Sequence, residues 1–350
     1  MRLEADGVAL QETKIRGAGF RIGTAGFAVT TSAAIPRTGF RIPGALRRFA
    51  WGVLGYNVAV IVWGAAVRAT GSGAGCGDHW PLCNGMLVQH HPAVATLIEL
   101  AHRGTSGVDL VCVLALVGWT FAKTPRRHLA RAAAVAVLVL TLNEAFLGAL
   151  LVMLGHTARD MSPARAVYLG LHLTNTLLLL AALALTAHFL SRAVALMRGS
   201  VRLRAPGLAV TGLAATLIVG VTGSLAALGD TLYPAHNLMT AIAQDYSPGS
   251  SWLLRIRWVH PAISFIAGAF ICWLVVSALR NAEAANAKPL AVAVALLLGV
   301  QYLLGAADVG LLAPTWMQMT HLLGADLLWI TLVLLSARLC LVPKQAKATV

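Results

Sequence analysis

Four histidines lie inside long apolar stretches of the chain: His102, His172, His260 and His321. An ionisable side chain is costly in an apolar span and usually faces a bundle interior or a cavity. Two neutral imidazoles from facing helices can take the two axial positions of a haem iron. A single histidine of this kind is equally well explained as a hydrogen-bonded packing residue, but four in one pattern favour haem binding.

The four histidines share one depth. The first basic residue at the C-terminal end of each stretch follows after 21, 20, 20 and 17 residues. A helix rises by about 1.5 Å per residue, which places the imidazoles about 25–32 Å from that end. A proton relay would need staggered depths, and structural zinc would need a tighter cluster with a thiolate or carboxylate. We therefore predict two haem sites, which pair His102 with His172 and His260 with His321.

A carboxylate accompanies only the first of these histidines. Glu99 lies three residues before His102, about one turn away on the same helix face, and Arg103 follows directly. The matching stretch before His260 carries Arg257 at the glutamate position. We therefore predict that Glu99 is catalytic, that the N-terminal half modifies a bound molecule, and that the C-terminal half holds a fixed redox site. A structural ion pair with Arg103 or a loop arginine is the alternative for Glu99.

Other polar residues suit supporting roles. Arg68 and Arg103 can hold haem propionates, because a guanidinium matches a carboxylate in bidentate geometry, or they can give structural support. Among the remaining polar residues of the apolar stretches, Glu144 and Asp308 are the two that we single out. The others are expected to act as hydrogen-bonding contacts between helices.

The elements that carry these residues are membrane spans. Only 11% of the residues are charged and 58% are hydrophobic, whereas a soluble domain has about 25% charged residues. A span needs about 20 mostly apolar residues, and the chain has eight such stretches. They cover residues 48–67, 93–122, 129–153, 164–190, 206–228, 256–279, 289–312 and 316–341. The sequence therefore predicts an all-α integral membrane protein.

The basic residues predict an orientation in the cell membrane. Most of those near the spans lie before the first, after the last, or between spans two and three, four and five, and six and seven. The positive-inside rule then places both termini in the cytoplasm and the loop 69–92 outside. Disulfides persist outside the cytoplasm, so Cys76 and Cys83 of TGSGAGCGDHWPLCNG can pair or act as a redox couple. The net charge of +14 is explained without a nucleic-acid partner.

The two halves of the chain repeat. VTGSLAALGDT at 221–231 is similar to ATGSGAGCGDH at 69–79, which indicates that the second half keeps part of the loop without its cysteines. The repeat predicts two four-helix bundles in parallel orientation. The expected segments are a mobile cytoplasmic tail at 1–46, an N-terminal bundle at 47–192, a cytoplasmic linker at 193–205, a C-terminal bundle at 206–341 and a cytoplasmic tail at 342–350.

Three features together resemble the haem A synthase family of cytochrome oxidase assembly proteins. They are the stretch RATGSGAGCGDHWPLCNG, the ELAHR of the second span, and four histidines in the even-numbered spans of a duplicated chain. The resemblance covers about residues 48–340. It implies an oxidoreductase that converts a methyl group of haem O, through an alcohol and a geminal diol, to the formyl group of haem A.

The resemblance also implies residue roles and partners. The assigned residues are His102 and His172 for haem O, His260 and His321 for the iron of haem b, Glu99 for catalysis, and Cys76 and Cys83 for the loop. The implied partners are haem O supplied by a haem O synthase, a quinol or another membrane electron carrier, and membrane lipids. Association into a homo-oligomer is left open. The competing hypotheses are a di-haem membrane cytochrome that only passes electrons from quinol, which leaves Glu99 unexplained, and a transporter.

Overall fold

The computed structural model describes residues 41–86, 89–158, 160–192, 196–199, 201–204 and 206–343. Most of the predicted N-terminal tail at 1–46 therefore lies outside the described residues, as does the C-terminal tail beyond Pro343. The loop 69–92 is described except at positions 87 and 88, and the linker 193–205 only in part.

In the part of the chain that the structure describes, eight long helices confirm the predicted spans. They are α1 (Gly44–Ala69), α2 (Val94–Lys123), α3 (Leu129–Met153), α4 (Pro163–Ser191), α5 (Gly207–Leu232), α7 (Trp252–Arg280), α8 (Lys288–Gly310) and α9 (Thr315–Cys340). Each is long and apolar enough to cross a membrane. The short elements are η1 (Ser72–Ala74), α6 (Leu238–Tyr246), η2 (Ala282–Ala287), β1 (Val201–Leu203) and β2 (Leu341–Pro343). The prediction of an all-α membrane protein is confirmed.

Polar residues of the connecting loops set where several helices begin. At the start of α4, the Ser162 side chain accepts a hydrogen bond from the N–H of Arg165, and Pro163 is the first helical residue. Proline suits this position because its missing N–H would have no partner there. Asn237 caps α6 in the same way, by accepting from the N–H of Thr240. These caps satisfy N–H groups that the first turn leaves open.

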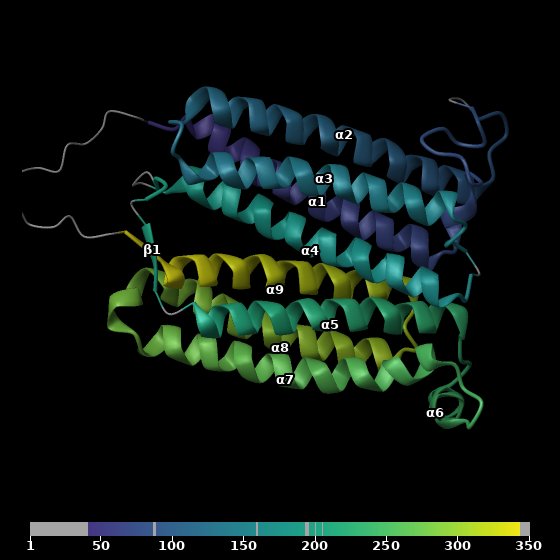
Figure 1. Cartoon of the computed structure of the whole chain (residues 1–350). Helices are drawn as coiled ribbons and strands as arrows, with labels where there is room; N and C mark the ends of the chain where they lie inside the picture. Colours follow the sequence, from purple (N-terminus) through teal and green to yellow (C-terminus); the bar gives the residue numbers. More distant parts are fainter. Residues whose placement is uncertain are drawn as a thin grey trace, which may run out of the picture. The chain divides into compact units, whose positions relative to one another are not determined.

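The helices form two groups that meet along α4 and α9 (Figure 1). In the first group α1, α2, α3 and α4 contact one another in succession, and α4 returns to α1. In the second group α5, α7, α8 and α9 do the same, and α9 returns to α5. The buried indole N–H of Trp329 in α9 donates to the carbonyl of Leu177 in α4 at 2.7 Å. The groups therefore share a packed interface, and their relation as a parallel repeat stays a prediction.

Backbone pairing connects the segments at one end of the helices. β1 and β2 form an antiparallel ladder in which Val201 pairs with Pro343. The N–H of Leu129 donates to the carbonyl of Leu196, and the N–H of Arg198 donates to that of Arg127. Part of the expected linker is therefore held against the starts and ends of the helices around it.

The prediction that residues 221–231 keep part of the cysteine loop is wrong. VTGSLAALGDT lies within α5, whereas residues 70–79 follow α1 in a loop that contains η1. The physical reason is composition. Leu225 and Ala227 are strong helix formers, while the cysteine loop has Gly73 and Gly75 in their place. The second half therefore keeps no shortened copy of the loop at this position.

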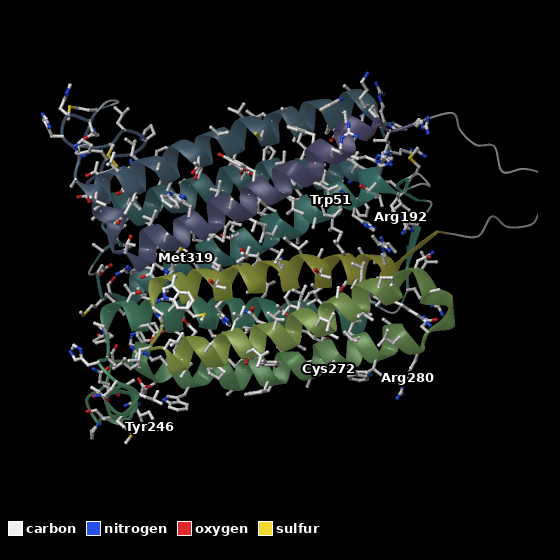
Figure 2. All side chains as sticks on the ribbon, turned by 180° about the vertical axis from the view of Figure 1, so that it is seen from behind. Trp51, Arg192, Tyr246, Cys272, Arg280 and Met319 are labelled. Atoms are coloured by element: carbon white, nitrogen blue, oxygen red, sulfur yellow. A yellow bond between two sulfur atoms is a disulfide. The ribbon has the colours of Figure 1, made fainter. Side chains whose placement is uncertain are left out.

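The two ends of the helices differ in residue type. Figure 2 shows Arg192 and Arg280 at one end and Tyr246, the last residue of α6, at the other. The first end also holds Lys123 and Arg338, in the last turns of α2 and α9. This arrangement is the one from which the positive-inside rule predicts a cytoplasmic face, and the orientation stays a prediction.

Candidate functional site

Each of the four histidine rings lies against a glycine of a neighbouring helix. A Cβ atom added to Gly64, Gly223 or Gly305 would lie closer to the ring than ordinary contact allows, so the missing side chain makes room for these three rings. At Gly148 an added Cβ would be in ordinary van der Waals contact with the ring. The pairs, with the distance from the added Cβ to the nearest ring atom, are Gly64 with His102 (2.9 Å), Gly148 with His172 (3.8 Å), Gly223 with His260 (2.9 Å) and Gly305 with His321 (3.1 Å).

Sequence reasoning missed these glycines, although a signal was present. Gly64 and Gly223 are 159 residues apart, close to the 158 residues that separate His102 from His260. The structure gives the reason for this spacing, because each glycine faces the histidine of the helix that follows it in its group.

The second-group histidines face each other at a distance that suits haem. The ring centroids of His260 on α7 and His321 on α9 are 6.5 Å apart, and the ring planes are at 89°. An imidazole nitrogen binds a metal at about 2 Å, and the ring centre lies about 1 Å further out, so two rings on opposite sides of one iron have centres about 6 Å apart. The two rings therefore fit the axial positions of a haem iron.

The first-group histidines form the corresponding pair. His102 lies on α2 and His172 on α4, two helices of the same group. The Nδ1 atom of each ring is buried and has no hydrogen-bond partner among the described residues. A buried polar atom without a partner calls for an explanation, and an ion is one of them. Neutral imidazole nitrogens are haem ligands, so this pair also fits haem.

Among the residues that the structure describes, no three or more His, Cys, Asp or Glu side chains gather as a metal cluster. The two histidine pairs are donor sets of another kind, with two neutral nitrogens each. Such a pair suits the axial positions of haem, where the porphyrin supplies the remaining ligands.

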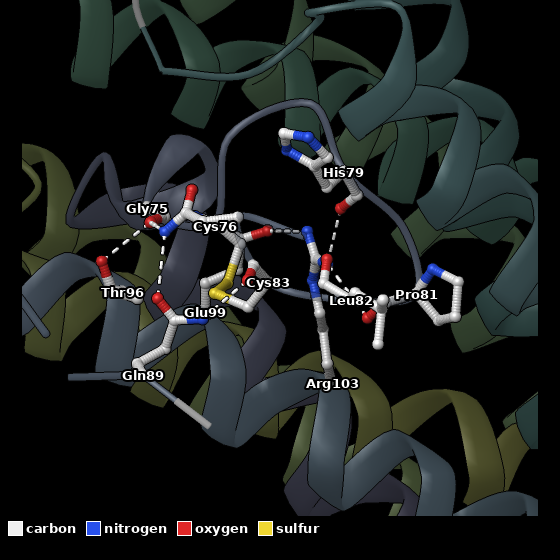
Figure 3. Close-up of polar contacts among 11 residues, drawn as sticks. Gly75, Cys76, His79, Pro81, Leu82, Cys83, Gln89, Thr96, Glu99 and Arg103 are labelled. Atoms are coloured by element: carbon white, nitrogen blue, oxygen red, sulfur yellow. Dashed lines mark hydrogen bonds and ion pairs between the residues drawn. A yellow bond between two sulfur atoms is a disulfide. The ribbon is translucent and has the colours of Figure 1, made fainter. Parts of the chain in front are cut away.

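Glu99 is buried and both of its oxygens are engaged (Figure 3). Its Oε2 accepts a hydrogen bond from the backbone N–H of Cys76 at 2.8 Å, and its Oε1 lies 2.5 Å from Nη2 of Arg103. The ion pair that was the alternative for Glu99 is therefore present. A catalytic role for Glu99 stays a prediction, and the carboxylate also joins α2 to the cysteine loop.

Arg103 holds the cysteine loop in place. Its Nη1 donates to the carbonyl oxygens of His79, Pro81 and Leu82 at 2.7, 3.3 and 2.9 Å (Figure 3). These contacts are structural support, one of the two roles predicted for this arginine. A role in binding a haem propionate stays a prediction.

The structure confirms a disulfide between Cys76 and Cys83. The two cysteines are 0% and 1% exposed, so the bond is shielded from solvent. The loop packs closely on the start of α2, because a Cβ added to Gly75 would lie 2.5 Å from the backbone of Ala95. The hydroxyl of Thr96 also donates to the carbonyl of Gly75 at 2.7 Å.

Arg68 joins the two helix groups. From the end of α1 it donates to the carbonyl of Ala227 at 3.0 Å and the hydroxyl of Thr231 at 3.1 Å in α5, and to Oε1 of Gln318 in α9 at 2.8 Å. These are again contacts of structural support, and the propionate role of Arg68 stays a prediction.

In the second group, Arg257 stands at the position that corresponds to Glu99 in the first group. A positive side chain with acidic partners therefore takes the place of a negative side chain with a basic partner. Arg257 pairs with Asp230 at 2.8 Å and with Asp245 at 3.2 Å, and it donates to the carbonyls of Gly229 and Tyr233. Burial raises the pKa of the Asp245 carboxyl, although the Arg257 guanidinium and a hydrogen bond from Trp258 act in the opposite direction. Arg257 thus holds α6 and the end of α5, whereas Glu99 and Arg103 hold the cysteine loop.

A second carboxylate lies beside the other histidine of the first group. Oε1 of Glu144 on α3 is 3.6 Å from Nε2 of His172. The glutamate also accepts short hydrogen bonds from Asn175 Nδ2 and Thr176 Oγ1, which sequence reasoning did not single out. Gln301 has the matching place beside His321. The first group therefore has one carboxylate 3.6 Å from His172 and another, Glu99, about one helical turn before His102.

The model of a family described as cytochrome oxidase assembly protein, COX15-CtaA, matches residues 47–333. A Thermus thermophilus protein named Protoheme IX farnesyltransferase is 43% identical over 295 residues, which are 83% of this chain and 48% of that protein. The chain thus spans about half the length of this relative.

Two shorter matches carry another name. A protein of Exiguobacterium sp. named Heme A synthase is 38% identical over 90 residues, which are 26% of this chain and 30% of that protein. A Bacillus mycoides protein of the same name is 37% identical over 120 residues, which are 34% of this chain and 37% of that protein.

Proposed function

We propose, because this chain belongs to the COX15-CtaA family of cytochrome oxidase assembly proteins, that it oxidises a methyl group of haem O to the formyl group of haem A. Two relatives named Heme A synthase support this activity. The observation that carries it is the asymmetry of the two groups. Both pairs of histidines fit haem, but only the first pair has carboxylates beside it and a disulfide loop held over α2.

The residues divide the work between the two groups. His102 and His172 hold haem O as the substrate, and His260 and His321 hold a resident haem b. When bound, the porphyrin iron supplies the redox chemistry, and the protein supplies orientation and control of protons and water. Residue Glu99 transfers a proton or stabilises positive charge at the reacting edge. The loop closed by Cys76 and Cys83 shields that edge from bulk water.

The reaction requires two kinds of partner. Conversion of a methyl to a formyl group is two two-electron oxidations. Each takes one oxygen from water and releases two electrons and two protons, giving first the alcohol and then a geminal diol, which loses one water to leave the formyl group. A quinone or another membrane electron carrier accepts the electrons. The supplier of haem O is an enzyme that farnesylates protohaem, which the name of the Thermus relative supports. The chain lies in the cell membrane with its cytoplasmic face at Arg192 and Arg280 and with the loop 69–92 outside.

Product analysis tests this proposal. Purified full-length protein is incubated with haem O and a quinone, and the extracted haems are separated chromatographically. We expect a formyl haem from the wild type. Glu99→Gln should keep bound haem and lose the conversion by about 100-fold or more, the usual size of acid–base contributions. Asp109→Asn is the matched control, because Asp109 is a buried carboxylate of α2 that bonds Asn57 instead of the loop.

The same assay separates the competing functions. A di-haem cytochrome that only passes electrons leaves haem O unchanged while its own Soret band responds to quinol. A transporter gives no Soret band. Conversion at the wild-type rate by Glu99→Gln contradicts the role given to the glutamate but leaves the overall activity standing.

A further inference from the structure

We propose that Glu144 is a positioning residue that strengthens His172 as an iron ligand, so that the haem iron of the first group is easier to oxidise than that of the second. The proposal rests on the haem binding given under the proposed function. It arises from a difference between matched positions: a carboxylate beside His172 and an amide beside His321.

Glu144 is fixed in place on α3. Its Oε2 accepts a hydrogen bond from Asn175, and its Oε1 accepts one from Thr176. Asn175 is itself held by the side chain of Asn143, which donates to its Oδ1 at 2.8 Å. Both carboxylate oxygens therefore accept hydrogen bonds. These bonds restrict rotation of the side chain and keep the carboxylate close to the ring of His172.

The helix register places Glu144 on the face of α3 that borders the ring of His172. Glu144 and Gly148 are four residues apart, which puts them on one face of α3. Gly148 lies in ordinary contact range of the ring of His172, 3.8 Å from an added Cβ, and Oε1 of Glu144 lies 3.6 Å from Nε2 of the same ring. The side chains of His172 and Glu144 are 26% and 22% exposed, so the pair borders accessible space instead of closed packing.

The second group has the same register with different chemistry. Gln301 and Gly305 are four residues apart on α8, and Nε2 of Gln301 lies 3.3 Å from Nε2 of His321. Gln301 also donates to the carbonyl of His321 at 3.0 Å. Gly324 follows His321 as Asn175 follows His172, and a Cβ at Gly324 would lie 2.5 Å from Oε1 of Gln301. The space used by Asn175 in one group thus accommodates Gln301 in the other.

A carboxylate and an amide act differently on a ligating imidazole. A carboxylate close to a metal-bound histidine makes the ring a stronger donor. Oε1 of Glu144 lies 3.6 Å from Nε2 of His172, beyond hydrogen-bond distance, so it acts on the ring through its charge. A stronger donor stabilises the ferric state over the ferrous state and lowers the reduction potential. The neutral amide of Gln301 gives no such charge. The iron held by His102 and His172 should therefore have the lower potential of the two.

Potentiometric titration of the full-length protein measures this difference. The protein is loaded with protohaem, and each site is measured alone: the first in the His260→Ala, His321→Ala background, and the second in the His102→Ala, His172→Ala background. We expect Glu144→Gln to raise the first midpoint by about 59 mV, which corresponds to a tenfold change in the ferric-to-ferrous affinity ratio. Gln301→Glu makes the opposite change and should lower the second midpoint.

Asp109→Asn is the control, because it removes a carboxylate from the same group without touching a histidine. An unchanged first midpoint in Glu144→Gln with protohaem still bound overturns the proposal, and so does an equal shift in Asp109→Asn. If Glu144→Gln does not fold, the test rests on Gln301→Glu: a lower second midpoint supports the proposal, and an unchanged one overturns it. A wild type that binds no haem overturns the proposed function as well, whereas bound haem with unshifted midpoints overturns only this inference.

Discussion

Two carboxylates lie beside the first-group histidines, and their surroundings suit different tasks. Glu99 is 3% exposed, and both of its oxygens are engaged by Arg103 and the Cys76 N–H. An acid held in this way is better placed to stabilise positive charge than to exchange a proton, because proton exchange would break its pair with Arg103. Glu144 is more accessible and points at a ring nitrogen, so it acts through His172.

The histidines and Glu99 were predictable from the sequence, because polar residues are rare within apolar spans and stand out. The glycines that face the rings were not. The chain has 33 glycines, and which of them faces a histidine depends on which helices are neighbours. The same holds for Asn175 and Thr176, whose importance comes only from their contact with Glu144.

Gly64→Ala tests the close contact between glycine and ring. The added methyl group would lie 2.9 Å from His102, and overpacking of this kind costs about 1–3 kcal/mol. We expect a lower thermal midpoint and a weaker Soret band from the first site. Gly55→Ala is the control on the same helix, since nothing lies within 4 Å of its added Cβ, and there alanine should be neutral or stabilising by up to about 1 kcal/mol. Equal effects of the two substitutions contradict the contact.

At the scale of the elements, the spans were predictable and their connections were not. Long apolar stretches have only one stable form in lipid, the helix, so the eight spans followed from composition. The short helix α6 and the ladder of β1 and β2 depend on tertiary contacts. Residues 221–231 show the same limit, because local similarity to the cysteine loop did not prevent them from continuing α5.

Arg103 holds the cysteine loop in addition to the Cys76–Cys83 disulfide. Arg103→Gln removes the donors to three loop carbonyls and the partner of Glu99, and each hydrogen bond from a charged group contributes about 1.5–3 kcal/mol. We expect reduction of Cys76–Cys83 by dithiothreitol, followed by thiol alkylation, to become about tenfold faster or more. Arg126→Gln, at the opposite end of α2, is the control. An unchanged rate in Arg103→Gln means that the arginine does not hold the loop.

At the scale of the whole described unit, the two groups are joined where their chemistry must be coordinated. The contact of Trp329 with Leu177 connects α9 to α4, and α4 carries His172. Arg68 reaches from the end of α1 to α5 and α9. The two helix groups are therefore fixed to one another by direct contacts between α4 and α9 and between α1, α5 and α9.

The most direct measurement of the central claim is the haem composition of two double variants supplied with haem O and a quinone. We predict that His102→Ala, His172→Ala keeps only protohaem and makes no formyl haem. His260→Ala, His321→Ala should still bind haem O but should not convert it. Formation of formyl haem at the wild-type rate by the first double variant would contradict the assignment of the chemistry to the first helix group.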